Sequence, residues 1–126
     1  MQTVIRTMTF LIDAESAGLS EDDQMKFVSA ISREPTMGEL MVGTGGCRKA
    51  RFPGKGKGKS GGYRTVHYFA GQDVPILLLA LVDKGSRDNL SKAERNELRS
   101  SLATYAEEYR KGTKRKLKEP GRRGRN

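Results

Sequence analysis

A β-sheet is indicated most directly by three neighbouring stretches of the chain: Tyr63-Arg-Thr-Val-His-Tyr-Phe69, Gly71-Gln72-Asp73 and Pro75-Ile-Leu-Leu-Leu-Ala-Leu-Val82. Short apolar or alternating runs broken by glycine are typical of antiparallel strands. We expect three strands, at about 46–52, 62–70 and 74–82, with a tight turn between the last two. The last strand is predicted to lie inside the sheet because it is apolar on both faces.

The N-terminal part of the chain is predicted to be mainly helical. The apolar runs between Val4 and Ile12 favour a short strand that leads into a short helix. Ser20, followed by three acidic residues, is a typical N-cap, and the helix that it begins should end near Arg33 because Pro35 cannot continue it. Its apolar residues at helical spacing are expected to form a buried stripe, namely Met25, Val28 and Ile31, with Phe27 beside them.

The C-terminal part is predicted to be one helix followed by a basic tail. Ser91 and Glu94 have the spacing of a capping box, which predicts a helix over about 92–109. Its apolar positions are Leu98, Leu102, Tyr105 and Tyr109. Residues 110–126 are basic and almost free of apolar side chains, so we expect them to be disordered. Together the elements predict an α+β fold in one domain over residues 1–109, with helices packed on a small antiparallel sheet.

The net charge of +9 is concentrated in two segments. Residues 46–69 hold seven basic side chains and no acidic one, and residues 110–126 hold nine basic residues against Glu119 alone. Neighbouring cations repel one another unless an anion offsets them, so this distribution is typical of a protein that binds a polyanion. The segment from Gly54 to Gly62 contains five glycines and three lysines and is predicted to be a cationic loop between the first two strands.

Several classes of protein are disfavoured. One cysteine, Cys47, and one histidine, His67, are too few for a disulfide framework or a zinc site built by the protein, so chemistry without a metal or cofactor is expected. Cys47 is more typical of a small buried residue than of a nucleophile, and His67 of a packed residue than of a general base. Gly58-Lys59-Ser60 copies the end of a P-loop, but Pro53 stands where that loop needs a glycine. The absence of a long apolar run or signal peptide favours a cytoplasmic protein.

Alternation of side chains along two strands predicts a cationic groove. Arg64 and Tyr68 should share one side of their strand. The preceding strand carries Arg48 on one side and Lys49 with Arg51 on the other, so pairing of the strands should bring basic side chains beside Arg64. Cleavage of RNA requires a base for the ribose 2′-hydroxyl, positive charge for the phosphate and a donor for the leaving oxygen. Such a groove supplies the charge, and it is equally suited to binding a nucleic-acid backbone without cutting it.

A set of short motifs follows in order along the chain: Gly43-Thr44-Gly45-Gly46, Arg48-Lys49-x-Arg51, Gly54-Lys-Gly-Lys-Gly-Lys-Ser-Gly-Gly-Tyr-Arg64, Tyr68-Phe69 and Leu90-Ser91-x-x-Glu94. This order resembles the HigB branch of the RelE/ParE toxin superfamily, over residues 3–109. The resemblance implies a RelE-like α+β domain in which one face of the sheet holds basic residues for messenger RNA in the ribosomal A site.

The same resemblance implies the toxin of a type II toxin–antitoxin system, a ribosome-dependent endoribonuclease that needs no metal and is neutralised by a cognate antitoxin, often of helix-turn-helix type. It assigns the scissile phosphate to Arg64, and base or charge to three lysines, Lys57, Lys59 and Lys84. Positioning of the RNA is expected from Arg48, Lys49, Arg51, Lys55 and Tyr68. The superfamily also includes members that poison gyrase without cutting RNA, so a non-enzymatic inhibitor of a protein target is one alternative, and a basic nucleic-acid-binding module is another.

Overall fold

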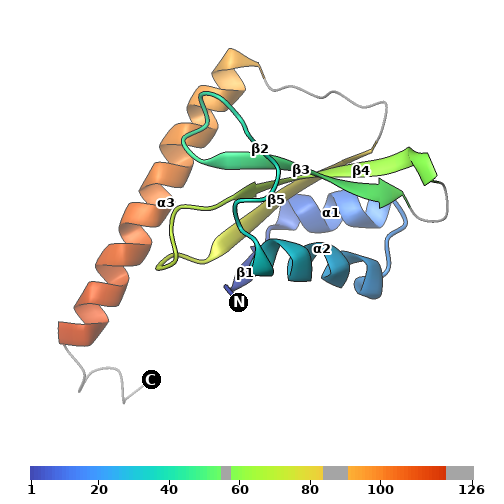
Figure 1. The fold of residues 1–126 in the computed structure, drawn as a ribbon. Coiled ribbons are helices and arrows are strands. Elements are labelled where there is room, and N and C mark those ends of the chain that lie inside the picture. The colour runs from blue at the N-terminus through green and yellow to red at the C-terminus, as the bar shows by residue number, and fades with distance from the viewer. Residues whose placement is uncertain (55–57, 84–90, 119–126) are drawn as a thin grey trace.

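The computed structural model describes residues 1–54, 58–83 and 91–118, with the side chains at 58–61, 83 and 114–118 outside this description. The elements, shown in Figure 1, are β1 (Val4–Arg6), α1 (Met8–Ser16), α2 (Glu21–Arg33), β2 (Glu39–Leu40), β3 (Cys47–Gly54), β4 (Gly58–Tyr68), β5 (Ile76–Asp83) and α3 (Lys92–Lys118). The predicted α+β class is confirmed, with helices on both faces of one sheet.

The sheet has five strands in the order β1-β5-β4-β3-β2. The three predicted strands correspond to β3, β4 and β5, and β5 lies inside the sheet as expected, between β1 and β4. The predicted sheet was purely antiparallel, whereas β1 pairs with β5 in parallel, Val4 opposite Ile76. A parallel pair needs a long crossover connection, and here α1, α2 and the three intervening strands supply it.

The glycine-rich segment 54–62 is predicted to be a loop, but most of its backbone belongs to β3 and β4. β3 continues to Gly54 and β4 already begins at Gly58, and these two residues pair across the hairpin. The ladder is made by main-chain hydrogen bonds, so residues without side chains can extend it. Within the predicted loop over 54–62, residues 55–57, which include Lys55 and Lys57, lie outside the described residues, and so do the side chains at 58–61.

Two N-terminal helices cover one face of the sheet (Figure 1). Ser20 caps α2 in a capping box with Asp23, as its sequence indicated. The buried residues of α2 are Gln24, Phe27, Ile31 and Ser32, whereas Met25, expected in the buried stripe, is 41% exposed. The helix is rotated relative to the prediction because Phe27 packs on the Phe52 ring of β3, with ring centroids 4.6 Å apart.

The long C-terminal helix α3 covers part of the other face. Leu102 and Ala106 are buried against the sheet, and Tyr105 donates a hydrogen bond from its hydroxyl to the Pro75 carbonyl at 2.9 Å. Arg110 then forms an ion pair with Asp73 in the β4–β5 turn, Nε to Oδ2 at 2.7 Å. Among the helices described, including the 27-residue α3, none has the length and apolar character of a membrane span.

The prediction of a disordered tail is wrong for residues 110–118. These residues are helical and continue α3 beyond the sheet (Figure 1). Extending an existing helix costs much less than starting one, and cations are favoured near a helix C-terminus by its dipole. Residues 119–126 lie outside the described residues.

The connection from α2 to β2 depends on a glycine. Gly38 has a φ of 86°, a conformation that costs other residues about 1–2 kcal/mol, and a Cβ there would meet the carbonyl oxygen of Lys49. Gly18 has a similar φ of 74°, but a Cβ on it would meet nothing within 4 Å.

We expect Gly38→Ala to lower the free energy of unfolding by about 3 kcal/mol, because it adds a clash with backbone to the conformational cost. Gly18→Ala should lower it by only about 1–2 kcal/mol. Urea denaturation of both variants measures the difference, and equal losses would contradict the proposed clash.

Candidate functional site

A cluster of cations lies on the face of β3 and β4 that α3 covers only in part. Arg51 pairs directly with Arg64 across the two strands, and Lys49 pairs with Val66. Side chains alternate along a strand, so Lys49, Arg51 and Arg64 share one face. The prediction that strand pairing brings basic side chains beside Arg64 is therefore confirmed for Lys49 and Arg51.

The electrostatics of this cluster favour an anion. Arg51 is exposed, and Lys49 and Arg64 are half-buried. Like charges directly opposite one another destabilise a pair of strands, and a bound anion offsets that cost. Guanidinium groups are also suited to phosphate, because their planar fork donates to two oxygens and keeps its proton. The face can therefore hold a phosphate where Arg51 and Arg64 meet.

Arg48 lies on the opposite face of β3 from this cluster. Its Nη1 atom donates hydrogen bonds to the carbonyl oxygens of Thr36 at 2.9 Å and Gly38 at 3.4 Å. Arg48 thus braces the connection between α2 and β2. Its predicted role in RNA positioning would require a second contact surface, away from Arg64.

His67 pairs with Arg48 across the strands and is completely buried. Its Nε2 atom is 2.8 Å from the Pro35 carbonyl, an acceptor, so the proton of the neutral ring sits on Nε2. Burial lowers the pKa of His67, and the Arg48 charge lowers it further, despite the hydrogen bond to Pro35. His67 faces away from Arg64, as predicted, and its position does not allow it to act as a base there.

Cys47 and Tyr68 are on the face of the cationic cluster but lie beneath α3. Burial raises the pKa of Cys47 to about 11, so it stays a thiol, in agreement with the prediction of a small buried residue. Tyr68 is 5% exposed, and its ring packs edge-on against Tyr105, with centroids 6.3 Å apart. The predicted stacking of Tyr68 on RNA bases is blocked by α3 in this arrangement.

The predicted lysines of the site fall largely outside the described part of the chain. Lys55, Lys57 and Lys84 lie outside the described residues, and so does the side chain of Lys59, whose backbone belongs to β4. Their roles stay predictions. Within the described residues, no group of three His, Cys, Asp or Glu side chains is arranged to hold a metal ion.

Two arginines that the sequence analysis missed stand beside this face. Arg95 and Arg99 of α3 lie against the glycines of the loop between β2 and β3. The charge count by segment did not indicate these arginines, because residues 70–109 carry more acidic than basic side chains. The signal that could have indicated them is their spacing of four residues on one helix face, flanking the apolar Leu98.

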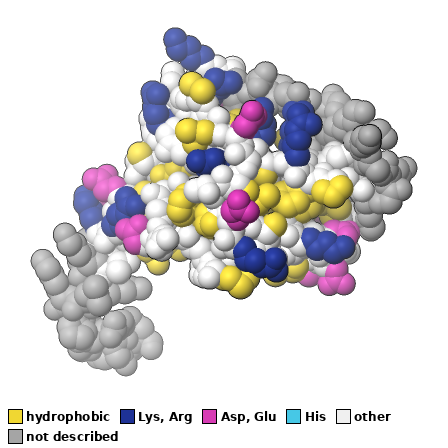
Figure 2. Space-filling model, in the orientation of Figure 1, with side chains coloured by type: hydrophobic (Ala, Val, Ile, Leu, Met, Phe, Trp, Pro, Cys, Tyr) yellow, Lys and Arg dark blue, Asp and Glu magenta, His cyan; other side chains and the backbone are white. Residues whose placement is uncertain are grey.

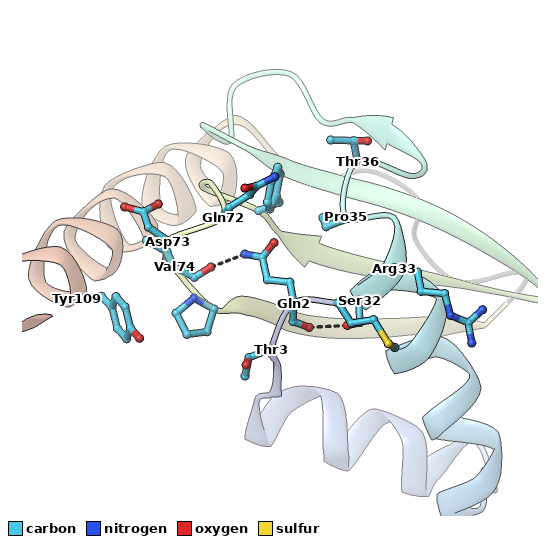
Figure 3. Close-up of a pocket in the computed structure, with 13 residues that line it drawn as sticks. Gln2, Thr3, Ser32, Arg33, Pro35, Thr36, Gln72, Asp73, Val74 and Tyr109 are labelled. Carbon is cyan, nitrogen blue, oxygen red and sulfur yellow. Dashed lines mark hydrogen bonds between the residues drawn. The ribbon is translucent and has the colours of Figure 1, made fainter.

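A hollow of about 790 Å³ lies elsewhere on the described surface. Figure 3 shows it between the N-terminus, the end of α2 and the β4–β5 turn, where Gln2 donates to the Val74 carbonyl at 2.8 Å and accepts a hydrogen bond from Ser32. Its lining includes Arg33 and Asp73 but no cation of the Arg51–Arg64 cluster. We take the cationic face as the candidate site because it gathers the cations suited to a phosphate.

Fold and site together define a small α+β protein with a cationic sheet face suited to a polyanion. A family model described as "RelE toxin of RelE / RelB toxin-antitoxin system" matches residues 2–125. The chain therefore belongs to the RelE toxin family, whose members are toxins of type II toxin–antitoxin systems.

Burial of His67 should make the fold sensitive to acid. The pKa of His67 is lowered from 6.5 in the folded state, so below pH 6.5 the unfolded chain takes up a proton that the folded chain resists. We expect the free energy of unfolding to fall between pH of about 7.5 and about 5, and to fall less in His67→Gln. Urea denaturation at both pH values measures this, and the shared effect of carboxylates cancels in the comparison. Equal pH dependence of the two proteins would contradict the expectation.

Proposed function

We propose that this RelE-family toxin is a ribosome-dependent endoribonuclease of the HigB-like branch, which cuts messenger RNA and so inhibits translation in the cytoplasm. The observation that carries the proposal is the pairing of Arg51 with Arg64 on a cationic sheet face. Membership of the RelE family supports it. A metal-independent mechanism fits this site, because arginine supplies the positive charge that a phosphate needs.

In the proposed reaction the ribose 2′-hydroxyl loses its proton and attacks the adjacent phosphorus, and the 5′-oxygen of the next nucleotide leaves. Arg64 holds the scissile phosphate and stabilises the charge that grows on its oxygens. Lys57, Lys59 and Lys84 supply the base, the donor or further charge, since His67 is buried on the other face. A lysine surrounded by other cations has a lowered pKa, which suits it to act as a base.

The residues proposed to position RNA differ in how well their places in the fold support that role. Lys49 and Arg51 share the face of Arg64, which supports their contact with the same strand of RNA. Arg48 is held by the α2–β2 connection, and Tyr68 is covered by α3, so both are weaker candidates. The proposed contact of Lys55 with RNA rests on its position in the sequence alone.

The partner that we propose is a cognate antitoxin. The name of the matching family pairs RelE with RelB, so an antitoxin that neutralises this chain is the natural expectation. We infer, from the resemblance to the HigB branch, that this antitoxin carries a helix-turn-helix domain. The remaining partners in the proposal are the ribosome and its messenger RNA.

We expect Arg64→Ala to lower the rate of message cleavage by about 10²–10³-fold, the usual cost of removing one donor to a transition-state anion. The measurement is growth and messenger-RNA integrity after induction in a bacterial host. Arg33→Ala is the matched control, because Arg33 is an exposed arginine at the end of α2, on the other side of the sheet.

Growth arrest with cut messages in the wild type and in Arg33→Ala, but not in Arg64→Ala, supports the nuclease and its site together. Arrest by the wild type with intact messages would refute the nuclease and favour a protein target such as gyrase. A wild type that neither arrests growth nor cuts messages would refute the activity altogether.

The helical extension after Arg110 is proposed to strengthen ribosome binding. Deleting residues 111–126 removes eight basic residues but leaves the Arg110–Asp73 ion pair and the core of α3. We expect an unchanged melting temperature, a weaker affinity for ribosomes and a shallower salt dependence. Changing Lys114, Arg115, Lys116 and Lys118 to glutamine keeps the length of the helix and should weaken binding in the same direction. Unchanged affinity at low salt would contradict the proposal.

A further inference from the structure

The Gly43-Thr44-Gly45-Gly46 loop between β2 and β3 has a fixed shape that the proposed catalytic site does not explain. Gly43, Gly45 and Gly46 have φ values of 83°, 76° and 134°. Thr44 is completely buried, and its hydroxyl donates to the Met41 carbonyl at 2.7 Å and accepts from the Cys47 amide at 3.1 Å. The loop is thus a rigid turn that presents bare backbone where its glycines lie.

Two arginine stems of α3 lie on this bare backbone. A Cβ at Gly45 would stand 3.0 Å from Cγ of Arg99, and one at Gly43 would stand 3.7 Å from Cδ of Arg95. Arg95 also donates from Nη1 to the Val42 carbonyl at 3.2 Å. Gly45 therefore does more than permit a turn, since it leaves room for the stem of Arg99.

The two arginines differ in exposure: Arg99 is exposed, whereas Arg95 is half-buried and its Nε atom is buried without a hydrogen-bond partner. Neither Arg95 nor Arg99 forms an ion pair with any residue in the described part of the chain, and the head of Arg99 contacts only the amide oxygen of Asn96, at 3.2 Å. The nearest acids on the helix are engaged or turned away. Glu94 accepts a hydrogen bond from the Ser91 amide, and Glu97 is two positions from each arginine, which places it on another side of the helix.

The pair borders the cationic face that holds Arg64. Leu98, between the two arginines, packs against the same core cluster as Val66 of β4, and Val66 is the direct partner of Lys49. Figure 2 shows Lys and Arg side chains gathered around the N-terminal end of α3 and the neighbouring strands, with acidic side chains in the minority there. Cations therefore lie both on the sheet face and on the side of α3, with the acid Glu39 directly opposite Lys49 on β2.

We propose that Arg95 and Arg99 bind phosphates of the RNA backbone next to the one held at Arg64, and so fix the direction in which the strand crosses the sheet. The inference rests on the proposed function. Arginines suit this task because the guanidinium fork matches two phosphate oxygens. Stems that are already packed on glycine lose little side-chain freedom when the phosphate binds, which lowers the cost of the contact. These are positioning residues, since the reacting phosphate is at Arg64.

The test compares the wild type with the double variant Arg95→Gln/Arg99→Gln, the charge-conserving Arg95→Lys/Arg99→Lys, and a control in which Lys26 and Arg33 of α2 become glutamine. Affinity for a short single-stranded RNA that carries 2′-O-methyl groups, and so cannot be cut, is measured at several salt concentrations. Affinity for vacant ribosomes is measured in parallel. Cleavage of programmed ribosomes gives kcat and KM separately.

For the glutamine pair we expect about tenfold weaker RNA binding and a salt slope shallower by about 1.4, the value for two phosphate contacts on a single strand. KM should rise with kcat nearly unchanged, whereas Arg64→Ala should lower kcat. The lysine pair should keep the salt slope, which a purely structural role of the arginines would not predict. Weaker binding of the glutamine pair to single-stranded RNA assigns the phosphates to the message. Weaker binding confined to vacant ribosomes assigns them to ribosomal RNA.

Equal RNA affinity and salt slope in the glutamine pair and the control would overturn the inference while leaving the nuclease intact. Conversely, a wild type that cuts no message refutes the proposed function, and the RNA-binding comparison still decides whether Arg95 and Arg99 contact phosphate.

Discussion

The hydrogen-bonded register of β4 between β3 and β5 is the constraint on which the rest of the structure depends. Thr65 and His67 are buried on the side of α1 and α2, and Arg64 and Tyr68 point to the side of α3. A slip of one residue would exchange these faces, burying an arginine under two helices and exposing the histidine. β5 adapts to this register through a bulge near Leu79, which lets both Leu78 and Leu81 reach the N-terminal helices.

Much of this arrangement was predictable from local patterns. The capping residues Ser20 and Ser91 located two helix starts, and the two-residue period of the strands placed Arg51 and Lys49 beside Arg64. The parallel pairing of β1 was not predictable, because it joins residues far apart in sequence and leaves no local signal. The rotation of α2 was missed for a similar reason, since it depends on which ring of the sheet Phe27 meets.

The candidate site was predicted only in part, and the missing parts share a cause. A strand pattern shows which residues share a face, but it does not show how much of that face another element covers. Tyr68 lies on the predicted face but is buried, because α3 packs over it. Arg95 lies near this face because it belongs to the same helix. Arg48 is satisfied by carbonyl groups of a connection whose path could not be derived from its sequence.

The long-range pairing of β1 also bears on how the protein comes into being. Val4 is separated from its partner Ile76 by both N-terminal helices and three strands. Folds dominated by contacts between distant parts of the chain form slowly, because loop closure precedes the gain from contact. Since α3 follows all five strands in the chain and completes the second core cluster, the native fold forms only after α3 has been synthesised. A ribosome thus translates all five strands and α3 before it meets the folded product.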